Sequence, residues 1–180
     1  VYNEKTNAIY ASCGVINING GTTTSTITNA VDVNYAWRCG HASLYVTDGE
    51  IIGKTNGVVH NDGGNYINVS GGHIVGQENN GINTSCTTDI TGGVIEGNVY
   101  GVYVNGGITT IGEDDDSISI AEPVIKGELY GLYITNPQQM TVNFYDGILK
   151  GQTWGYYNEV TNIPARSSII YGTETIDDNL

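Results

Sequence analysis

The segment VIEGNVYGVYV at residues 94–104 recurs as VIKGELYGLYI at residues 124–134 and as ILKGQTWGYY at residues 148–157. A looser form of the same template occurs earlier, as IIGKTNGVV at 51–59 and IVGQENNGIN at 74–83. Each copy has one glycine near its start and a second glycine four or five residues later. The first glycines are Gly53, Gly76, Gly97, Gly127 and Gly151, at spacings of 23, 21, 30 and 24 residues. A repeat of this length predicts a solenoid in which each copy forms one coil.

Alternating apolar residues predict three short parallel strands in each coil, because every second side chain of a strand points inward. We expect the first strand of each coil to bury a pair of residues, namely Leu44/Val46, Ile67/Val69, Ile118/Ile120 and Val142/Phe144 in successive coils. The second strand is expected to bury Ile51, Ile74, Ile95, Ile125 and Leu149. The third strand is expected to bury Val58, Ile82, Val102, Leu132 and Tyr156. The predicted fold is an all-β parallel β-helix, or β-solenoid, of about six to seven coils of roughly 21–30 residues. A sandwich or barrel is disfavoured, because tight hairpin turns between adjacent strands are missing from this spacing.

The regularity of the repeat changes along the chain. Residues 44–157 are regular, residues 1–43 are expected to form irregular coils, and residues 158–180 a tail, a cap or the start of a following module, all within one domain. The chain starts at Val1 inside a patterned segment, so we expect a piece of a longer protein. Bare solenoid ends are prone to aggregate, and flanking modules are therefore expected.

Acidic residues dominate the charge: 19 Asp and Glu against 6 Lys and Arg give a formal net charge of −13. That charge repels phosphates, which makes nucleic acid and anionic membrane surfaces poor partners. Nor does any apolar run approach the roughly 20 residues that cross a bilayer. We therefore expect neither nucleic-acid binding nor membrane insertion.

The three cysteines are Cys13, Cys39 and Cys86. Cys13 and Cys39 both precede a glycine and lie about one coil apart, so a disulfide between stacked coils is one interpretation. Two small buried thiols are the other. Cys86 stays unpaired in both.

Aromatic residues gather beside the second glycine in the last three copies. Aligning the copies stacks Tyr100, Tyr130 and Trp154 in one column and Tyr103, Tyr133 and Tyr157 in another. We expect Tyr103 and Tyr133 to face outward, since buried apolar residues flank them. Such a patch predicts a binding surface for a glycan or a protein. The alternative is that the rings only stabilise neighbouring coils.

Charged residues form two further candidate features. Glu96 and Lys126 align on neighbouring coils and are expected to pair. The acidic loop Glu113, Asp114, Asp115, Asp116 could hold calcium through its oxygens. A solvated loop is the alternative, and calcium is the one cofactor considered. His41, His60 and His73 share no metal-binding spacing.

Catalysis is the main rival to binding, because parallel β-helices also support polysaccharide lyases and hydrolases. Glycoside hydrolysis needs two carboxylates that flank the bond. Asp48 with Glu50 or Asp146 could supply them only through a coincidence of turn positions. The few Lys and Arg residues do not gather near acidic residues as an eliminating enzyme would need. We expect no catalytic residues.

The run ITTIGEDDDSISIAEPVIKGELYGLYI at 108–134, followed by TVNFYDGILKGQTWGYYNEV at 141–160, resembles the repeat of large surface-exposed β-helix proteins of Firmicutes, especially those of gut bacteria. The match covers about residues 108–157. The resemblance implies a right-handed, pectate-lyase-like parallel β-helix in a secreted, wall-associated or appendage-forming protein, and it implies no catalytic residues.

These observations together predict a non-enzymatic extracellular module, an adhesin or scaffold that binds a glycan or a partner protein on a cell surface. The first alternative is a carbohydrate-active β-helix enzyme, a lyase or hydrolase, or a degenerate relative of one. The second is a subunit that self-associates into a fibre through its exposed aromatic residues.

Overall fold

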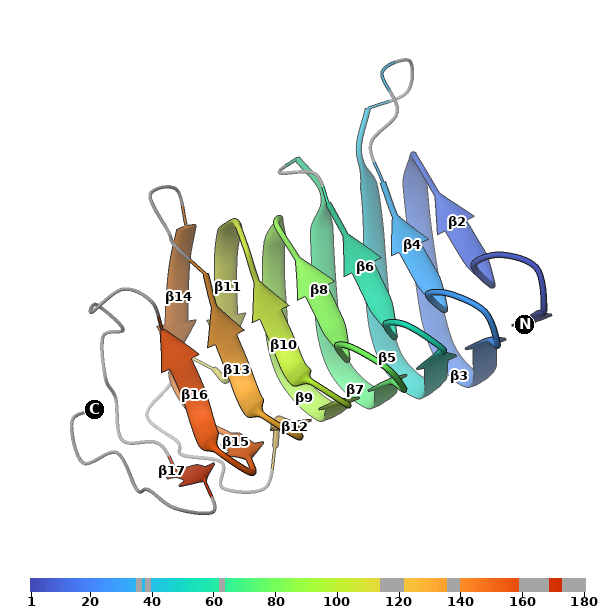
Figure 1. Ribbon diagram of the computed structural model, residues 1–180. Coiled ribbons are helices and arrows are strands. Elements are labelled where there is room, and N and C mark those ends of the chain that lie inside the picture. The colour runs from blue at the N-terminus through green and yellow to red at the C-terminus, as the bar shows by residue number, and fades with distance from the viewer. Residues whose placement is uncertain are drawn as a thin grey trace.

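The computed structural model describes residues 1–34, 37, 40–61, 64–113, 122–135, 140–158 and 169–172 (Figure 1). These residues form strands and turns and no helix, and the strands of each sheet pair in parallel. The chain winds as a right-handed β-helix: in Figure 1 the strands of the near side run upward and those behind run downward as the chain advances from the N-terminus. The predicted all-β parallel β-helix is confirmed. No helix able to span a membrane occurs among the described residues.

One side of the coil, which we call the third side, is a sheet of seven short strands in the described part of the chain. Its strands are β2 (Ile9–Ala11), β4 (Val31–Val33), β6 (Val58–His60), β8 (Ile82–Thr84), β10 (Tyr100–Val104), β13 (Tyr130–Ile134) and β16 (Trp154–Asn158). Neighbours in this sheet follow chain order, so each strand belongs to the next coil along the axis (Figure 1).

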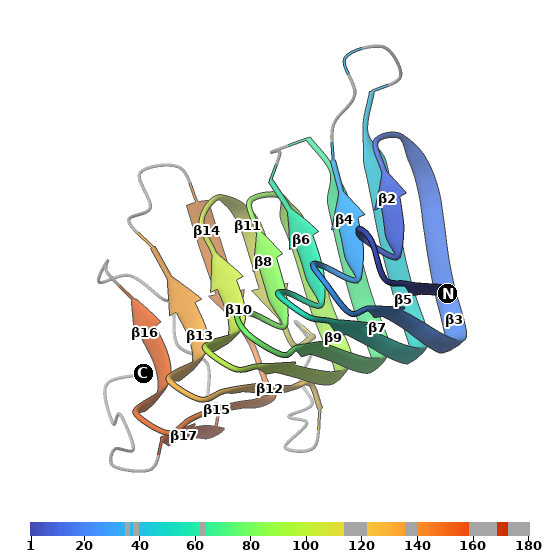
Figure 2. The same ribbon diagram turned by 45° about the vertical axis from the view of Figure 1, so that its right-hand side comes forward.

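The other two sides are formed by long strands that bend between them. These are β3 (Gly14–Ser25), β5 (Ala42–Gly53), β7 (Tyr66–Gly76) and β9 (Thr87–Gly97). Later coils divide the same path into β11 (Gly107–Ile111) and β12 (Val124–Gly127), then β14 (Met140–Phe144) and β15 (Ile148–Gly151). The short strand β1 (Tyr2–Asn3) pairs with β3. At the other end, β17 (Ile169–Gly172) pairs with β15 (Figure 2). We call the side before the bend the first side and the side after it the second side.

Two kinds of glycine shape the corners. At the bend between the first and second sides, Gly49, Gly72 and Gly93 have φ of 98°, 81° and 82°, a conformation that side chains disfavour. The second glycines of the template have no such φ. A Cβ on Gly101 would lie 2.6 Å from the carbonyl oxygen of Gly131 in the next coil, so close approach is what requires glycine there.

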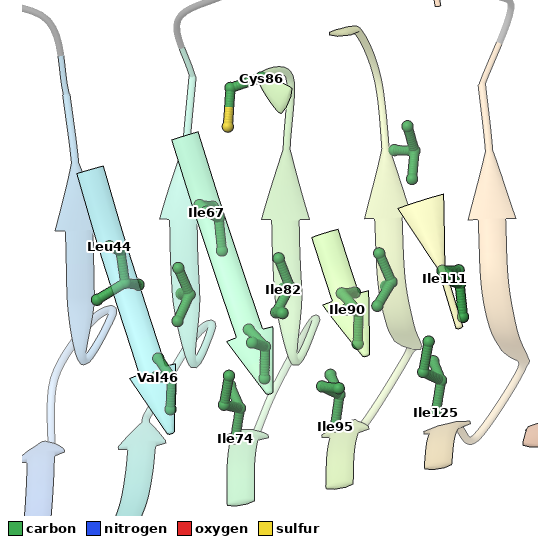
Figure 3. Packing of buried hydrophobic residues seen from close by; sticks show 14 of the residues in the cluster. Leu44, Val46, Ile67, Ile74, Ile82, Cys86, Ile90, Ile95, Ile111 and Ile125 are labelled. Carbon is green, nitrogen blue, oxygen red and sulfur yellow. The ribbon is translucent and has the colours of Figure 1, made fainter. Parts of the chain in front are cut away.

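The core runs through the centre of the solenoid as columns of aliphatic side chains, as Figure 3 shows for Ile74, Ile95 and Ile125. The second strands bury the five predicted residues, and so do the third strands, except that Tyr156 is only partly buried against the core. Equivalent residues pair in register, for example Ile95 with both Ile74 and Ile125. Stacked apolar columns of this kind supply most of the stabilisation of the coils.

One predicted strand was placed wrongly. The register aligns Thr109 and Ile111 of β11 with Val142 and Phe144, so this pair forms the first strand of its coil. The predicted pair Ile118 and Ile120 lies outside the described residues.

Candidate functional site

The aromatic residues predicted from the repeat lie on the outer face of the third side. Tyr100 pairs with Tyr130 and Tyr130 with Trp154, which forms one column. Tyr103 pairs with Tyr133, and Tyr133 with Tyr157, which forms the second. Tyr103 and Tyr133 lie between fully or almost fully buried neighbours, so their side chains point outward as expected.

Five of these rings form one near-parallel arrangement, which we call the tyrosine stack: Tyr100, Tyr103, Tyr130, Tyr133 and Tyr157. Along the second column, the ring centroids of Tyr103 and Tyr133 are 5.5 Å apart with planes 5° apart, and those of Tyr133 and Tyr157 are 5.4 Å apart. Tyr100 and Tyr133 are closest, at 4.4 Å. These separations are those of favourable aromatic pairs.

Stacking along the solenoid axis determines which part of each ring is available. A ring between two parallel neighbours has both faces covered, so it presents its edge and its hydroxyl group. Tyr157 and Trp154, in the last coil of the columns, are the most exposed of the six, at 40% and 41%. The face therefore offers a row of ring edges, with the largest open aromatic surface at one end.

The column of Tyr100, Tyr130 and Trp154 holds asparagines in the two earlier coils. Asn56 and Asn80 occupy the positions of Tyr100 and Tyr130, and both are buried. The Asn56 side chain donates to Asn29 Oδ1 at 2.9 Å, and its oxygen accepts from the backbone N–H of Asn80 at 3.0 Å. Between the coil of Asn80 and the coil of Tyr100, this column therefore changes from buried, hydrogen-bonded asparagines to outward-facing aromatic rings.

A groove that the sequence did not predict runs along the corner that follows β9, β12 and β15. Figure 2 shows this corner, where the chain turns toward the third side. It is lined by the residue before, at and after the first glycine of four consecutive coils, at 75–77, 96–98, 126–128 and 150–152, and encloses about 420 Å³. We call it the glycine groove. The sequence predicts the column of glycines, but the depth of the groove depends on how far the flanking side chains extend beyond that column.

Two of the four charged side chains along the groove form an ion pair with each other. Lys126 Nζ lies 2.6 Å from Glu96 Oε1, which confirms the predicted pair. The hydrogen bond from Lys126 holds the pKa of Glu96 below its ordinary value, so this carboxylate is ionised at neutral pH. Gln152 donates to Glu128. Lys150 has no hydrogen bond or ion pair with another described residue.

His73 extends this network toward the earlier coils. Its ring lies 3.4 Å from Glu96 and 3.9 Å from Glu50, close to both without a hydrogen bond to Glu96. His60 and His73 do not meet, because His60 is buried and bonded to Asn65, whereas the side chain of His73 lies on the outer surface. Within the described ranges there is no group of three or more His, Cys, Asp or Glu suited to a metal ion.

Other predicted positions are only partly described. Glu113 N–H donates to Asp146 Oδ1 at 3.3 Å, while Asp114, Asp115 and Asp116 lie outside the described residues, so the calcium prediction stays a prediction. Asp146 is buried, and Asp48 accepts from the N–H of Gly49 at 2.7 Å. Both carboxylates therefore accept backbone hydrogen bonds at turns.

The cysteines differ in environment. Cys13 is disulfide-bonded, and Cys39 lies outside the described residues. Cys86 is a free thiol, fully buried beside the hydroxyls of Thr84 and Thr88. Burial raises the pKa of the Cys86 thiol, so it is protonated and inert at neutral pH.

Comparison of the chain with protein-family models, with curated proteins and with solved structures gave no significant match. The resemblance to the surface β-helix proteins of Firmicutes therefore stays a prediction. Any function must be inferred from the chemistry of the residues themselves.

Proposed function

We propose that this chain is a non-enzymatic binding module, an adhesin or scaffold of a secreted or cell-surface protein, and that it binds a partner protein. The contact surface is the aromatic face: Tyr100, Tyr103, Tyr130, Tyr133, Trp154 and Tyr157. The observation that carries the proposal is the tyrosine stack, with Trp154 and Tyr157 exposed at its end.

Ring orientation favours a protein over a sugar on this face. A sugar ring packs flat against an open aromatic face, whereas the inner rings of the stack cover one another. These inner rings present a rigid row of edges and hydroxyl groups to the outside. Tyrosine and tryptophan on a rigid support are typical anchors of protein interfaces, because they bury a large area at little cost in conformational entropy.

An extracellular location is supported by Cys13. Its disulfide bond is typical of proteins that fold in an oxidising compartment, since cytosolic thiols are kept reduced. The net charge of −13 keeps such a module soluble and directs it away from anionic surfaces.

A non-enzymatic role is supported by what the carboxylates already do. Asp48 and Asp146 accept backbone hydrogen bonds in turns, and Glu96 is held by Lys126. A glycosidase needs a carboxyl with a raised pKa to donate a proton beside an ionised partner. Glu96, with its lowered pKa, is unsuited to the donor role.

The test is binding of the immobilised chain to a panel of extracellular-matrix and mucosal glycoproteins, each presented with and without enzymatic deglycosylation. We expect at least one partner to bind and to remain bound after deglycosylation. Substituting Trp154→Ala with Tyr157→Ala is expected to weaken binding about ten-fold or more. Tyr10→Ala is the matched control, because Tyr10 is exposed on the same sheet and in the same column, far from the stack.

Four results would contradict the proposal. Equal binding by the double variant and by Tyr10→Ala would show that the aromatic face is not the contact surface. Binding lost on deglycosylation would assign the face to a glycan. Turnover of polygalacturonate by the isolated chain would make the protein an enzyme. A solution mass that rises steadily with concentration would favour a fibre subunit.

A further inference from the structure

The glycine groove has the dimensions of a ligand site, on outward positions different from those of the tyrosine stack. Its volume of about 420 Å³ lies within the range of small-molecule sites. It crosses four consecutive coils, and parallel strands lie about 4.8 Å apart, so it extends roughly 14 Å along the axis. A ligand that fills it is linear.

Two rows of side chains, all polar except Val75, border the groove. The residues after the glycines, Gln77, Asn98, Glu128 and Gln152, are all exposed. The opposite row contributes Glu96, Lys126 and Lys150. Amides, carboxylates and ammonium groups together can donate to and accept from hydroxyl groups at each coil. The glycines between the two rows make room for the chain itself, because the Cβ position of Gly76, Gly97, Gly127 and Gly151 is in each case taken by a carbonyl oxygen of the same corner.

The balance of charge argues for a neutral ligand. Two carboxylates and two ammonium groups line the groove, and Glu96 with Lys126 already neutralise each other. Around the groove the chain has a net charge of −13, which repels a polyanion. Lys150, which forms no ion pair with another described residue, can donate to hydroxyl groups at one end.

We propose that the glycine groove binds a neutral, linear oligosaccharide with extended linkages, of the β-1,4 type. Such a chain advances by nearly one coil spacing for each sugar, so successive sugars meet equivalent side chains, and the groove covers roughly three of them. This site is independent of the protein-binding face proposed above, because no residue is shared between them.

The test is calorimetric or fluorescence titration of the folded chain with β-1,4-linked glucose, mannose and xylose oligomers of two to six units. Maltohexaose, whose α-1,4 linkages curve the chain, is the control for spacing, and hexagalacturonate is the control for charge. We expect a neutral β-1,4 oligomer to bind. Its affinity is expected to rise up to about three or four units and then to level off.

Paired variants assign the binding to the groove. Gln77→Ala with Asn98→Ala removes exposed side chains and is expected to weaken binding by at least about five-fold. Asn105→Ala lies in the same coil as Asn98 but outside the groove, and Trp154→Ala lies on the aromatic face. Both are expected to bind as the parent does.

Three outcomes would overturn the proposal: no binding of any neutral β-1,4 oligomer, stronger binding of hexagalacturonate, or equal binding by the Gln77/Asn98 variant and the parent. A Trp154→Ala variant that loses the oligosaccharide would move the site to the aromatic face. Loss of protein binding in Trp154→Ala with oligosaccharide binding intact would separate the two proposals.

Discussion

Tyr133 is the centre of the tyrosine stack, and replacing it tests whether the stack stabilises the solenoid. Its ring contacts four others, Tyr100, Tyr103, Tyr130 and Tyr157, at centroid distances of 4.4–5.7 Å. Tyr103, one coil earlier in the same column, contacts two rings. The two residues share side, column and orientation, so the number of ring contacts is the main difference between their Ala variants.

The magnitude of the effect is set by the ring contacts. Aromatic pairs contribute about 0.5–1.5 kcal/mol beyond the burial of area, and the lower value suits rings that are partly exposed. Tyr133→Ala is then expected to destabilise the fold by about 2 kcal/mol and Tyr103→Ala by about 1 kcal/mol. For a chain of this length, about 1 kcal/mol lowers the unfolding midpoint by roughly 2–4 °C.

Thermal unfolding followed by far-UV circular dichroism measures the effect at one protein concentration for all variants. We expect midpoints lowered by about 4–8 °C for Tyr133→Ala and about 2–4 °C for Tyr103→Ala. Tyr10→Ala, which removes an exposed ring that stacks on no other described ring, is expected to change stability by no more than about 0.5 kcal/mol. Tyr133→Phe keeps the ring and isolates the hydroxyl. Equal midpoints for the three Ala variants would refute the reasoning.

Three further predictions concern single positions. Gly101→Ala forces a Cβ to 2.6 Å from a carbonyl oxygen of the next coil and should cost about 1–3 kcal/mol. Gly106→Ala, whose nearest contact is 3.3 Å, should cost less in the same melts. Burial raises the pKa of Asp32, so its contribution to stability is full below its ordinary pKa and is lost as pH rises through the folded value. Asp32→Asn should therefore raise the melting temperature at pH 7 and leave it nearly unchanged at about pH 3; a larger gain in acid would contradict this sign. Cys86 should react with a thiol reagent only after the chain unfolds, and labelling of Cys86 in the folded chain would contradict its burial.

Much of the fold could be predicted because glycine marks its period. Gly53, Gly76, Gly97, Gly127 and Gly151 align in one register, and the residue two places before each, an isoleucine or Leu149, is buried in the core. A position with no room for a Cβ can be recognised from the sequence, because every copy of the repeat has glycine there. The pairing of Glu96 with Lys126 follows from the same alignment.

The misplaced strand shows where apolar patterning fails. Ile118 and Ile120 offered a more hydrophobic pair than Thr109 and Ile111, yet β11 contains the latter. Thr109 is fully buried, and Thr88 in the preceding coil is buried beside it in register. Threonine has nearly the shape of valine and suits a strand, so its hydroxyl misleads a reading based on hydrophobicity alone.

Neither the groove nor the ring orientation could be obtained from the sequence. The groove depends on the height of side chains such as Gln152 and Lys150 above the glycine column. The orientation depends on side-chain torsions, which the alternation pattern does not specify. Sequence alone therefore predicted an aromatic platform, whereas the structure has rings that cover one another.

The change from Asn80 to Tyr100 in one column links stability to binding. In the early coils the residues of this column are linked by internal hydrogen bonds, and in the later coils they are linked by stacked rings. The aromatic residues thus replace a structural ladder, and their inner members contribute to the stability of the stacked coils. Tyr157, at the exposed end of the stack, has stacked rings on one side only, those of Tyr130 and Tyr133 in the preceding coil, and Trp154 beside it is not one of the five stacked rings. A binding defect is therefore informative when it comes from these two residues, whereas one from Tyr133→Ala reports on the fold first.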